Sequence, residues 1–223
     1  MPIALVQDIS SSENDSTTIT TTFAAPPTDG NLLVLILAHR LGSGLALNIS
    51  GSPWTFVDVI QYSGTRNLEM YYKLASSTAA AVTVTFENKH RAILGLAEYS
   101  GMASSNVFDD WGSILTDTDT NTSLTVPLTA ASSQAEELLI CAIAKFGGTT
   151  SPTWTDAFVA QDNRRTGDGS THLSYQWADR IVAAIGTYET TGGWTTGRAA
   201  AGIIASFRGP FNQAIRSGAV ITT

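Results

Sequence analysis

The chain has 223 residues, of which 43% are hydrophobic and only 14% charged, and its formal net charge at pH 7 is -7. The 12 Lys and Arg residues are scattered rather than clustered, which argues against binding to a nucleic-acid backbone. The longest apolar run, residues 32–38, is of strand length and much shorter than the roughly 18 residues of a membrane-spanning helix, so we expect no membrane insertion.

Strand patterns follow one another along the whole chain, and helical periodicity is nearly absent. Glycine and proline turns separate them, as in residues 26–30 and 167–169. In chain order, the expected strands are 18–23, 32–39, 55–62, 68–74, 81–86, 92–99, 112–115, 123–128, 137–146, 157–162, 172–178, 186–190 and 199–207. Many short strands with such turns predict an all-β fold of the β-sandwich or jelly-roll-like type.

The two halves of the chain contain similar segments in the same order. Residues 32–38 recur as 138–144, 52–55 as 151–155, 68–74 as 173–179, and 97–101 as 205–209. This collinearity predicts an internal two-fold repeat, with halves at about 15–101 and 112–209. We expect a single β-sandwich domain over residues 1–209, with two separate small sandwiches as the alternative. Residues 210–223 have no counterpart in the first half and are expected to form a C-terminal arm.

The repeated segments carry a resemblance to a known kind of domain. They include Asp29-Gly30-Asn31-Leu32-Leu33-Val34, Ser52-Pro53-Trp54-Thr55, Met70-Tyr71-Tyr72-Lys73-Leu74-Ala75, Ala97-Glu98-Tyr99-Ser100-Gly101 and Trp177-Ala178-Asp179-Arg180. The pattern resembles a duplicated β-sandwich domain of bacterial surface proteins and tailed-phage structural proteins, over roughly residues 15–209. The resemblance implies a sandwich fold and a role in adhesion or virion architecture, without a common activity. Glu98 departs from it, because a small residue is expected there.

One acidic stretch partly follows the spacing of a calcium-binding loop. Asp117, Asp119 and Asn121 match the opening positions. However, Thr122 stands where the tight-turn glycine belongs, and Leu128 stands at the position of the bidentate glutamate. We therefore expect a solvated polar loop rather than a metal site.

The remaining reactive residue types also form no catalytic pattern. Three carboxylates on predicted strands are the best candidates for the paired acids of a glycosidase, but a solvated or interface position suits them better: Asp58, Glu69 and Glu98. The three histidines lie far apart and lack metal-ligand spacing: His39, His90 and His172. The only cysteine, Cys141, lies in an apolar run and is expected to be buried. We expect no enzymatic activity, no catalytic residue, no cofactor and no metal.

Aromatic residues occur at matching places in the two halves. Trp54 and Trp154 follow turn prolines, and we expect both to fill equivalent, mostly buried places at the start of a strand. Tyr71 and Trp177 lie on corresponding strands and are the candidate glycan contacts if their rings are exposed, although core or interface packing is the favoured interpretation.

These observations favour a structural phage virion protein, such as a head decoration, fibre or tail-associated subunit, over an enzyme. The N-terminus lacks the features of a secretion signal, so we expect a protein made in the host cytoplasm and incorporated into the virion. Its expected partners are other copies of itself and other virion proteins. The candidate interface residues are in the C-terminal arm: Phe211, Ile215, Val220 and Ile221. The alternative function is a carbohydrate-binding or adhesin module, with glycans as partners.

Overall fold

The computed structural model describes residues 1–40, 46, 48–51, 53–62, 64–116, 119–147, 153–167 and 172–210, and this part of the chain is all β. No helix occurs in these residues, so none of them forms a helix long and apolar enough to cross a membrane. The strands are β1 (Ala4–Thr22), β2 (Leu32–Arg40), β3 (Asn48–Ile49), β4 (Thr55–Tyr62), β5 (Arg66–Leu74), β6 (Ala81–Ser100), β7 (Phe108–Thr116), β8 (Ser123–Pro127), β9 (Glu137–Phe146), β10 (Thr153–Trp154), β11 (Val159–Arg165), β12 (Leu173–Val182), β13 (Glu189–Gly193) and β14 (Ala200–Arg208). The predicted all-β, sandwich-type fold is confirmed.

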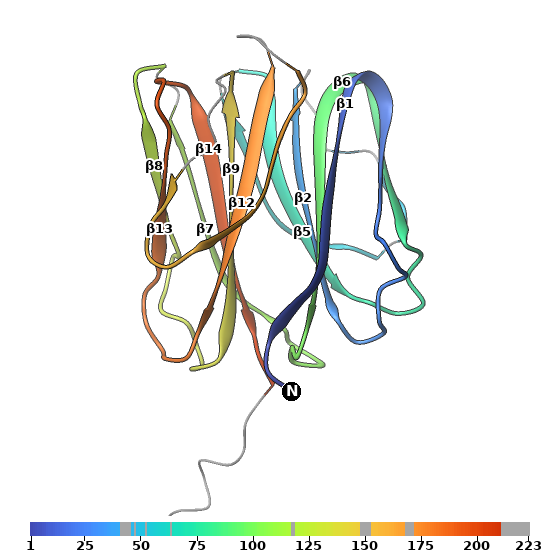
Figure 1. The fold of residues 1–223 in the computed structure, drawn as a ribbon, viewed down its shortest axis with the longest axis vertical. Coiled ribbons are helices and arrows are strands. Elements are labelled where there is room, and N and C mark those ends of the chain that lie inside the picture. Colours follow the sequence, from blue (N-terminus) through green and yellow to red (C-terminus); the bar gives the residue numbers. More distant parts are fainter. Residues whose placement is uncertain are drawn as a thin grey trace, which may run out of the picture.

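The first half of the chain forms a sheet with the order β1-β6-β2-β5-β4, here called sheet A. β1 and β6 are long antiparallel partners with register shifts on both sides of Ser16, and there the pair bends over. Figure 1 shows this arch of β1 and β6 at the upper right. The segments beyond the arch cover the outer face of sheet A, and Ile19, Val82 and Val84 pack there against Leu33 and other residues of β2.

The second half forms sheet B, with the order β11-β12-β9-β14-β7, and the smaller sheet C, with the order β10-β13-β8. Sheet C covers the outer face of sheet B. Leu124 and Val126 of β8 pack there against Leu139 and Ile143 of β9. Gly202 on β14 faces this layer, and a side chain at that position would collide with Val126.

Sheets A and B pack face to face and share one hydrophobic core. Alternate residues of β2, such as Val34 and Ile36, meet alternate residues of β9, such as Ile140 and Ala142. Because each of these sheets also has a covered outer face, every position of β2 and β9 except the last is buried. The layers lie side by side in Figure 1, from β8 and β13 at the left to β1 and β6 at the right. The central strands are therefore apolar on both faces, which explains their continuous apolar sequence.

Corresponding strands occupy corresponding places in sheets A and B. The central strands β2 and β9 are flanked by β6 and β14 on one side and by β5 and β12 on the other. Trp54 and Trp154 are both half-buried, Trp54 against the outer core of sheet A and Trp154 against the outer core of sheet B. This arrangement is compatible with the expected internal repeat, which stays a prediction.

The observed strands differ from the predicted ones mainly at β1 and β6. Strands 55–62 and 137–146 have the predicted bounds, as β4 and β9. The polar N-terminal stretch was not predicted as a strand, yet β1 starts at Ala4. The two strands expected at 81–86 and 92–99 are one strand of 20 residues, because pairing with β1 continues through the arch. The two-residue strands β3 and β10 were also not predicted.

Candidate functional site

The two predicted glycan contacts lie inside the protein. Trp177 on β12 is 1% exposed and packs in the core between sheets A and B. Tyr71 on β5 is 8% exposed, faces the outer core of sheet A, and donates its hydroxyl hydrogen to Glu69 Oε2 at 2.6 Å. Neither ring is exposed, so the condition for a glycan contact is not met at these two positions, and both residues have the favoured core packing.

The three carboxylates considered as a glycosidase pair do not converge. Glu98 pairs with Leu33 of β2 from one side, and Glu69 pairs with Leu37 from the other. Four residues of strand correspond to about 13 Å, whereas the two acids of a glycosidase lie at most about 9.5 Å apart. Asp58 on edge strand β4 precedes Val59, which pairs with Glu69, so the Asp58 and Glu69 side chains point to opposite faces of sheet A.

Glu98 stands where the resembled domain is expected to have a small residue. Its buried carboxylate accepts hydrogen bonds from the turn that precedes β2. Glu98 is 1% exposed. Its Oε1 accepts hydrogen bonds from the Thr28 N–H at 2.8 Å and from Asn31 Nδ2 at 2.6 Å, and its Oε2 accepts one from Gln7 Nε2 at 2.5 Å. The carboxylate thus joins the β1 edge to the turn and has a structural use.

His39 and His90, which are distant in the sequence, meet in the outer core of sheet A. Their ring centroids are 5.3 Å apart, and Phe86 stacks on His90 at 4.4 Å. His39 Nε2 lies 2.7 Å from Glu69 Oε1, and both side chains are fully buried. No group of three His, Cys, Asp or Glu that could hold a metal ion occurs among the described residues.

The stretch with partial calcium-loop spacing is tied to the segment before β14. Asp119 Oδ1 accepts a hydrogen bond from the Ala199 N–H at 3.1 Å. The Asn121 carbonyl accepts one from Trp194 Nε1 at 2.9 Å. Asp117 lies outside the described residues.

The cysteine is buried, as expected. Cys141 lies in the second-half core, and burial raises the pKa of its thiol well above the usual value.

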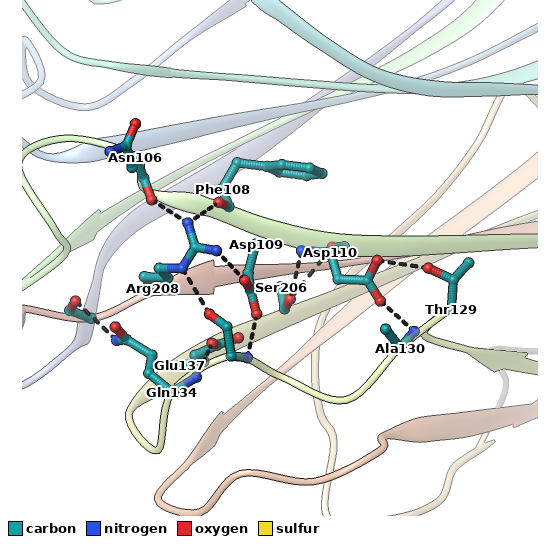
Figure 2. Close-up of polar contacts among 12 residues, drawn as sticks. Asn106, Phe108, Asp109, Asp110, Thr129, Ala130, Gln134, Glu137, Ser206 and Arg208 are labelled. Carbon is teal, nitrogen blue, oxygen red and sulfur yellow. Dashed lines mark hydrogen bonds and ion pairs between the residues drawn. The ribbon is translucent and has the colours of Figure 1, made fainter.

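A cluster of polar contacts lies at the end of sheet B where β9 begins and β14 ends (Figure 2). We call Asp109, Asp110, Glu137, Ser206 and Arg208 the basal network. The Arg208 guanidinium forms an ion pair with Asp109 and donates to the carbonyls of residues 106 and 108 at 2.8 and 2.6 Å. Asp110 Oδ2 accepts a hydrogen bond from the N–H of residue 130 at 2.7 Å, and the Asp110 N–H donates to Ser206 Oγ at 3.1 Å. The network ties β7 and β14 to the loops beside them.

The two carboxyl groups of the basal network have opposite electrostatic environments. Burial and the neighbouring Asp109 raise the pKa of Glu137 to about 7. The pKa of Asp109 is lowered, because its hydrogen bonds with Ser133 and Glu137 and the charge of Arg208 outweigh the opposing effect of burial. Asp109 is held ionised between Arg208 and the Ser133 N–H, which donates to its Oδ2 at 2.7 Å. Arg208 and Ser133 thus bind both carboxylate oxygens of Asp109. We therefore interpret the ion pair of Asp109 with Arg208 as a structural contact that stabilises this end of sheet B.

Raising the pH from 5 to 8 is expected to lower the stability of the protein through Glu137. In the unfolded chain this carboxyl has the ordinary pKa of 4.5, and in the folded protein its pKa is about 7. Its contribution to stability is therefore complete below pH 4.5 and is lost as the pH rises through 7. Glu137→Gln, which keeps a hydrogen-bond donor without a titratable proton, should have a shallower slope of melting temperature against pH. Equal slopes in the two proteins would contradict the assignment.

Exposed apolar side chains gather on one edge strand. Trp111, Ile114 and Leu115 of β7 are 40%, 39% and 41% exposed. β7 is the last strand of sheet B, and among the described residues only β14 pairs with it. It packs beside β4, the last strand of sheet A, which carries the exposed Phe56. We call Trp111, Ile114 and Leu115 the β7 strip. The sequence contained no signal for it, because buried and exposed apolar residues look alike in a strand.

The predicted interface residues of the C-terminal arm lie outside the described residues: Phe211, Ile215, Val220 and Ile221. Their role stays a prediction. The described chain reaches Pro210, directly after the basal network.

Comparison with protein families, with curated proteins and with solved structures found no match.

Proposed function

We propose that this chain is a structural subunit of a protein assembly, of the kind that builds tailed-phage virions, and that it works by packing against neighbouring subunits. The observation that carries the proposal is the β7 strip. Three of the nine large hydrophobic side chains that are exposed in the described chain lie on this one edge strand.

An edge strand with exposed apolar side chains is suited to contact a second protein. The Trp111 carbonyl already accepts a hydrogen bond from the Thr129 N–H at 3.2 Å, so a second strand would pair with β7 beyond this point, around Ile114 and Leu115. The apolar side chains there gain free energy when they leave water. Ile114 and Leu115 are consecutive, so they point to opposite faces of the strand. A neighbour that pairs with β7 would therefore cover apolar surface on both faces.

Replacing both Ile114 and Leu115 by lysine is expected to dissociate the assembly without unfolding the subunit. Each substitution places a charge in the proposed interface, with a cost of about 2 kcal/mol, or roughly a 30-fold rise in Kd. Light scattering coupled to size exclusion measures the mass, and thermal melting measures the fold. The unsubstituted protein should form an oligomer of defined mass, and the variant should be a monomer with nearly the same melting temperature.

Val159→Lys is the matched control, because Val159 is 59% exposed and lies on β11, the opposite edge strand of the same sheet. This variant should remain oligomeric. A monomeric unsubstituted protein, or an equal loss of assembly in the control, would contradict the role of the β7 strip.

A further inference from the structure

A second surface feature is a groove next to the basal network. It lies where β4 begins and β5 ends, against the loop before β7, and its volume is about 720 Å³. This is within the range of roughly 300–1,000 Å³ that is usual for small-molecule sites. We call it the Tyr72 groove. Its lining includes six residues with polar side chains that could contact a ligand: Thr55, Tyr72, Lys73, Ser76, Ser77 and Asn106.

Uncharged polar side chains form part of the groove's lining, beside apolar residues such as Leu74 and Val107. Thr55, Ser76, Ser77 and Asn106 are all exposed. In the part of the chain that the structure describes, their side-chain hydroxyl and amide groups make no hydrogen bond; the bonds of Ser76 and Ser77 are made by their backbone N–H groups. Hydroxyls and amides both donate and accept. They suit a ligand that carries many hydroxyl groups.

The aromatic wall of the groove is held rigidly. The Tyr72 ring stacks on Phe108 with centroids 5.3 Å apart and an interplanar angle of 9°. It also meets the edge of Phe207 at 5.5 Å. Tyr72 is half-buried, so it adds an ordered wall that is apolar in its body and polar at its hydroxyl.

One fixed cation lies in the groove. Lys73 Nζ donates a hydrogen bond to the Gly51 carbonyl at 2.5 Å and lies 5.0 Å from the centre of the Trp54 ring. Burial lowers the pKa of Lys73. No carboxylate is among the described residues that line the groove. An ammonium group that is partly withdrawn from water gains strongly from a negatively charged partner.

Two residues of the groove have a left-handed backbone conformation, which serine seldom adopts and asparagine adopts more readily. Ser77 and Asn106 both have φ of 48°, and they are two of the five non-glycine residues with positive φ in the described chain. They come from different loops, and both line the groove. Such conformations persist where the surrounding structure enforces them, and they are enriched at ligand sites.

We propose that the Tyr72 groove binds an acidic saccharide, such as a polymer of uronic acids. The hydroxyl and amide groups of Thr55, Ser77 and Asn106 would take the place of water on the sugar hydroxyls, and Lys73 would pair with the carboxylate. This inference goes beyond the packing function proposed above, and it moves glycan binding from Tyr71 and Trp177 to a site that faces solvent.

The test is titration calorimetry of the full chain with tetragalacturonate, and with maltotetraose as the neutral probe. Tetragalacturonate should bind with a Kd below about 1 mM. The double variant Ser77→Gly, Asn106→Gly should bind it at least about 10-fold more weakly, because two polar partners are lost. Glycine adopts positive φ without strain, so both loops should keep their conformation and the melting temperature should hardly change.

Ala157→Gly is the matched control, since Ala157 also has positive φ, of 58°, but does not line the groove. It should bind tetragalacturonate like the unsubstituted protein. Lys73→Gln should remove the preference for the acidic probe. Absence of tetragalacturonate binding, unchanged binding in the double variant, or equally tight binding of maltotetraose would each overturn the proposal. None of these results depends on the β7 strip.

Discussion

Replacing Trp177 by alanine is expected to destabilise the protein by about 3–5 kcal/mol, the usual cost of removing a large aromatic side chain from a packed core. Trp177 is 1% exposed and belongs to the core shared by sheets A and B. Its strand, β12, is paired on both sides, by β9 and β11. The surrounding strands therefore have little freedom to close the cavity. Urea-induced unfolding measures the change.

Ile181→Ala is the control for this experiment, because Ile181 lies on the same strand and is 50% exposed. It should cost much less stability than Trp177→Ala. The comparison also separates the two roles considered for Trp177. A glycan contact on the surface would lose binding and keep its stability, whereas a core residue loses stability. A cost below about 1 kcal/mol for Trp177→Ala would contradict the core position.

Arg208→Met is expected to cost about 2–4 kcal/mol, because it leaves Asp109 in the basal network without its cation. The Arg208 side chain is only 28% exposed, and that of Asp109 is 5% exposed. The substitution also removes the donors to the carbonyls of Asn106 and Phe108. Methionine retains most of the apolar length of the arginine side chain, so the effect reports mainly the lost polar contacts.

Adding Asp109→Asn to Arg208→Met should recover part of this loss, because the remaining side chain then carries no unpaired charge. The recovery is expected to be about 1–2 kcal/mol in a double-mutant cycle measured by chemical denaturation. Lys89→Met serves as the comparison. Its ion pair with Asp15 is 3.5 Å long, with side chains 65% and 74% exposed, and it should contribute no measurable stability. Additive effects of the two substitutions would show that Arg208 does not neutralise Asp109.

The sequence was sufficient for the fold class and for strands with a strong local pattern. β9 was predicted with its observed bounds because its residues are apolar almost throughout and glycines follow it at once. β4 was predicted for similar reasons. The N-terminal part of β1 could not be predicted, because residues 10–16 are all polar and lack alternation. Backbone pairing with β6, a strand more than sixty residues away along the chain, keeps this segment extended.

The arrangement of the layers decided which side chains are accessible. Alternation along a strand assigns residues to two faces, but it cannot show that both faces are covered. Sheets A and B pack against each other through one face, and a further layer covers the other face of each sheet. Tyr71 and Trp177 are buried for this reason, although the sequence alone allowed either of them to be exposed.

The polar sites depend on contacts between distant parts of the chain. Asp109 and Arg208 are 99 residues apart, and Ser77 and Asn106 belong to different loops. No local spacing reveals such pairs, because their geometry arises only when β7 pairs with β14 and when the loops of sheet A meet the connection to sheet B. The sequence by itself therefore determined the all-β class and the strands with a strong local pattern, such as β4 and β9. Only the tertiary structure decided where the basal network, the β7 strip and the Tyr72 groove lie, because long-range strand pairing and layer packing bring their residues together and set their exposure.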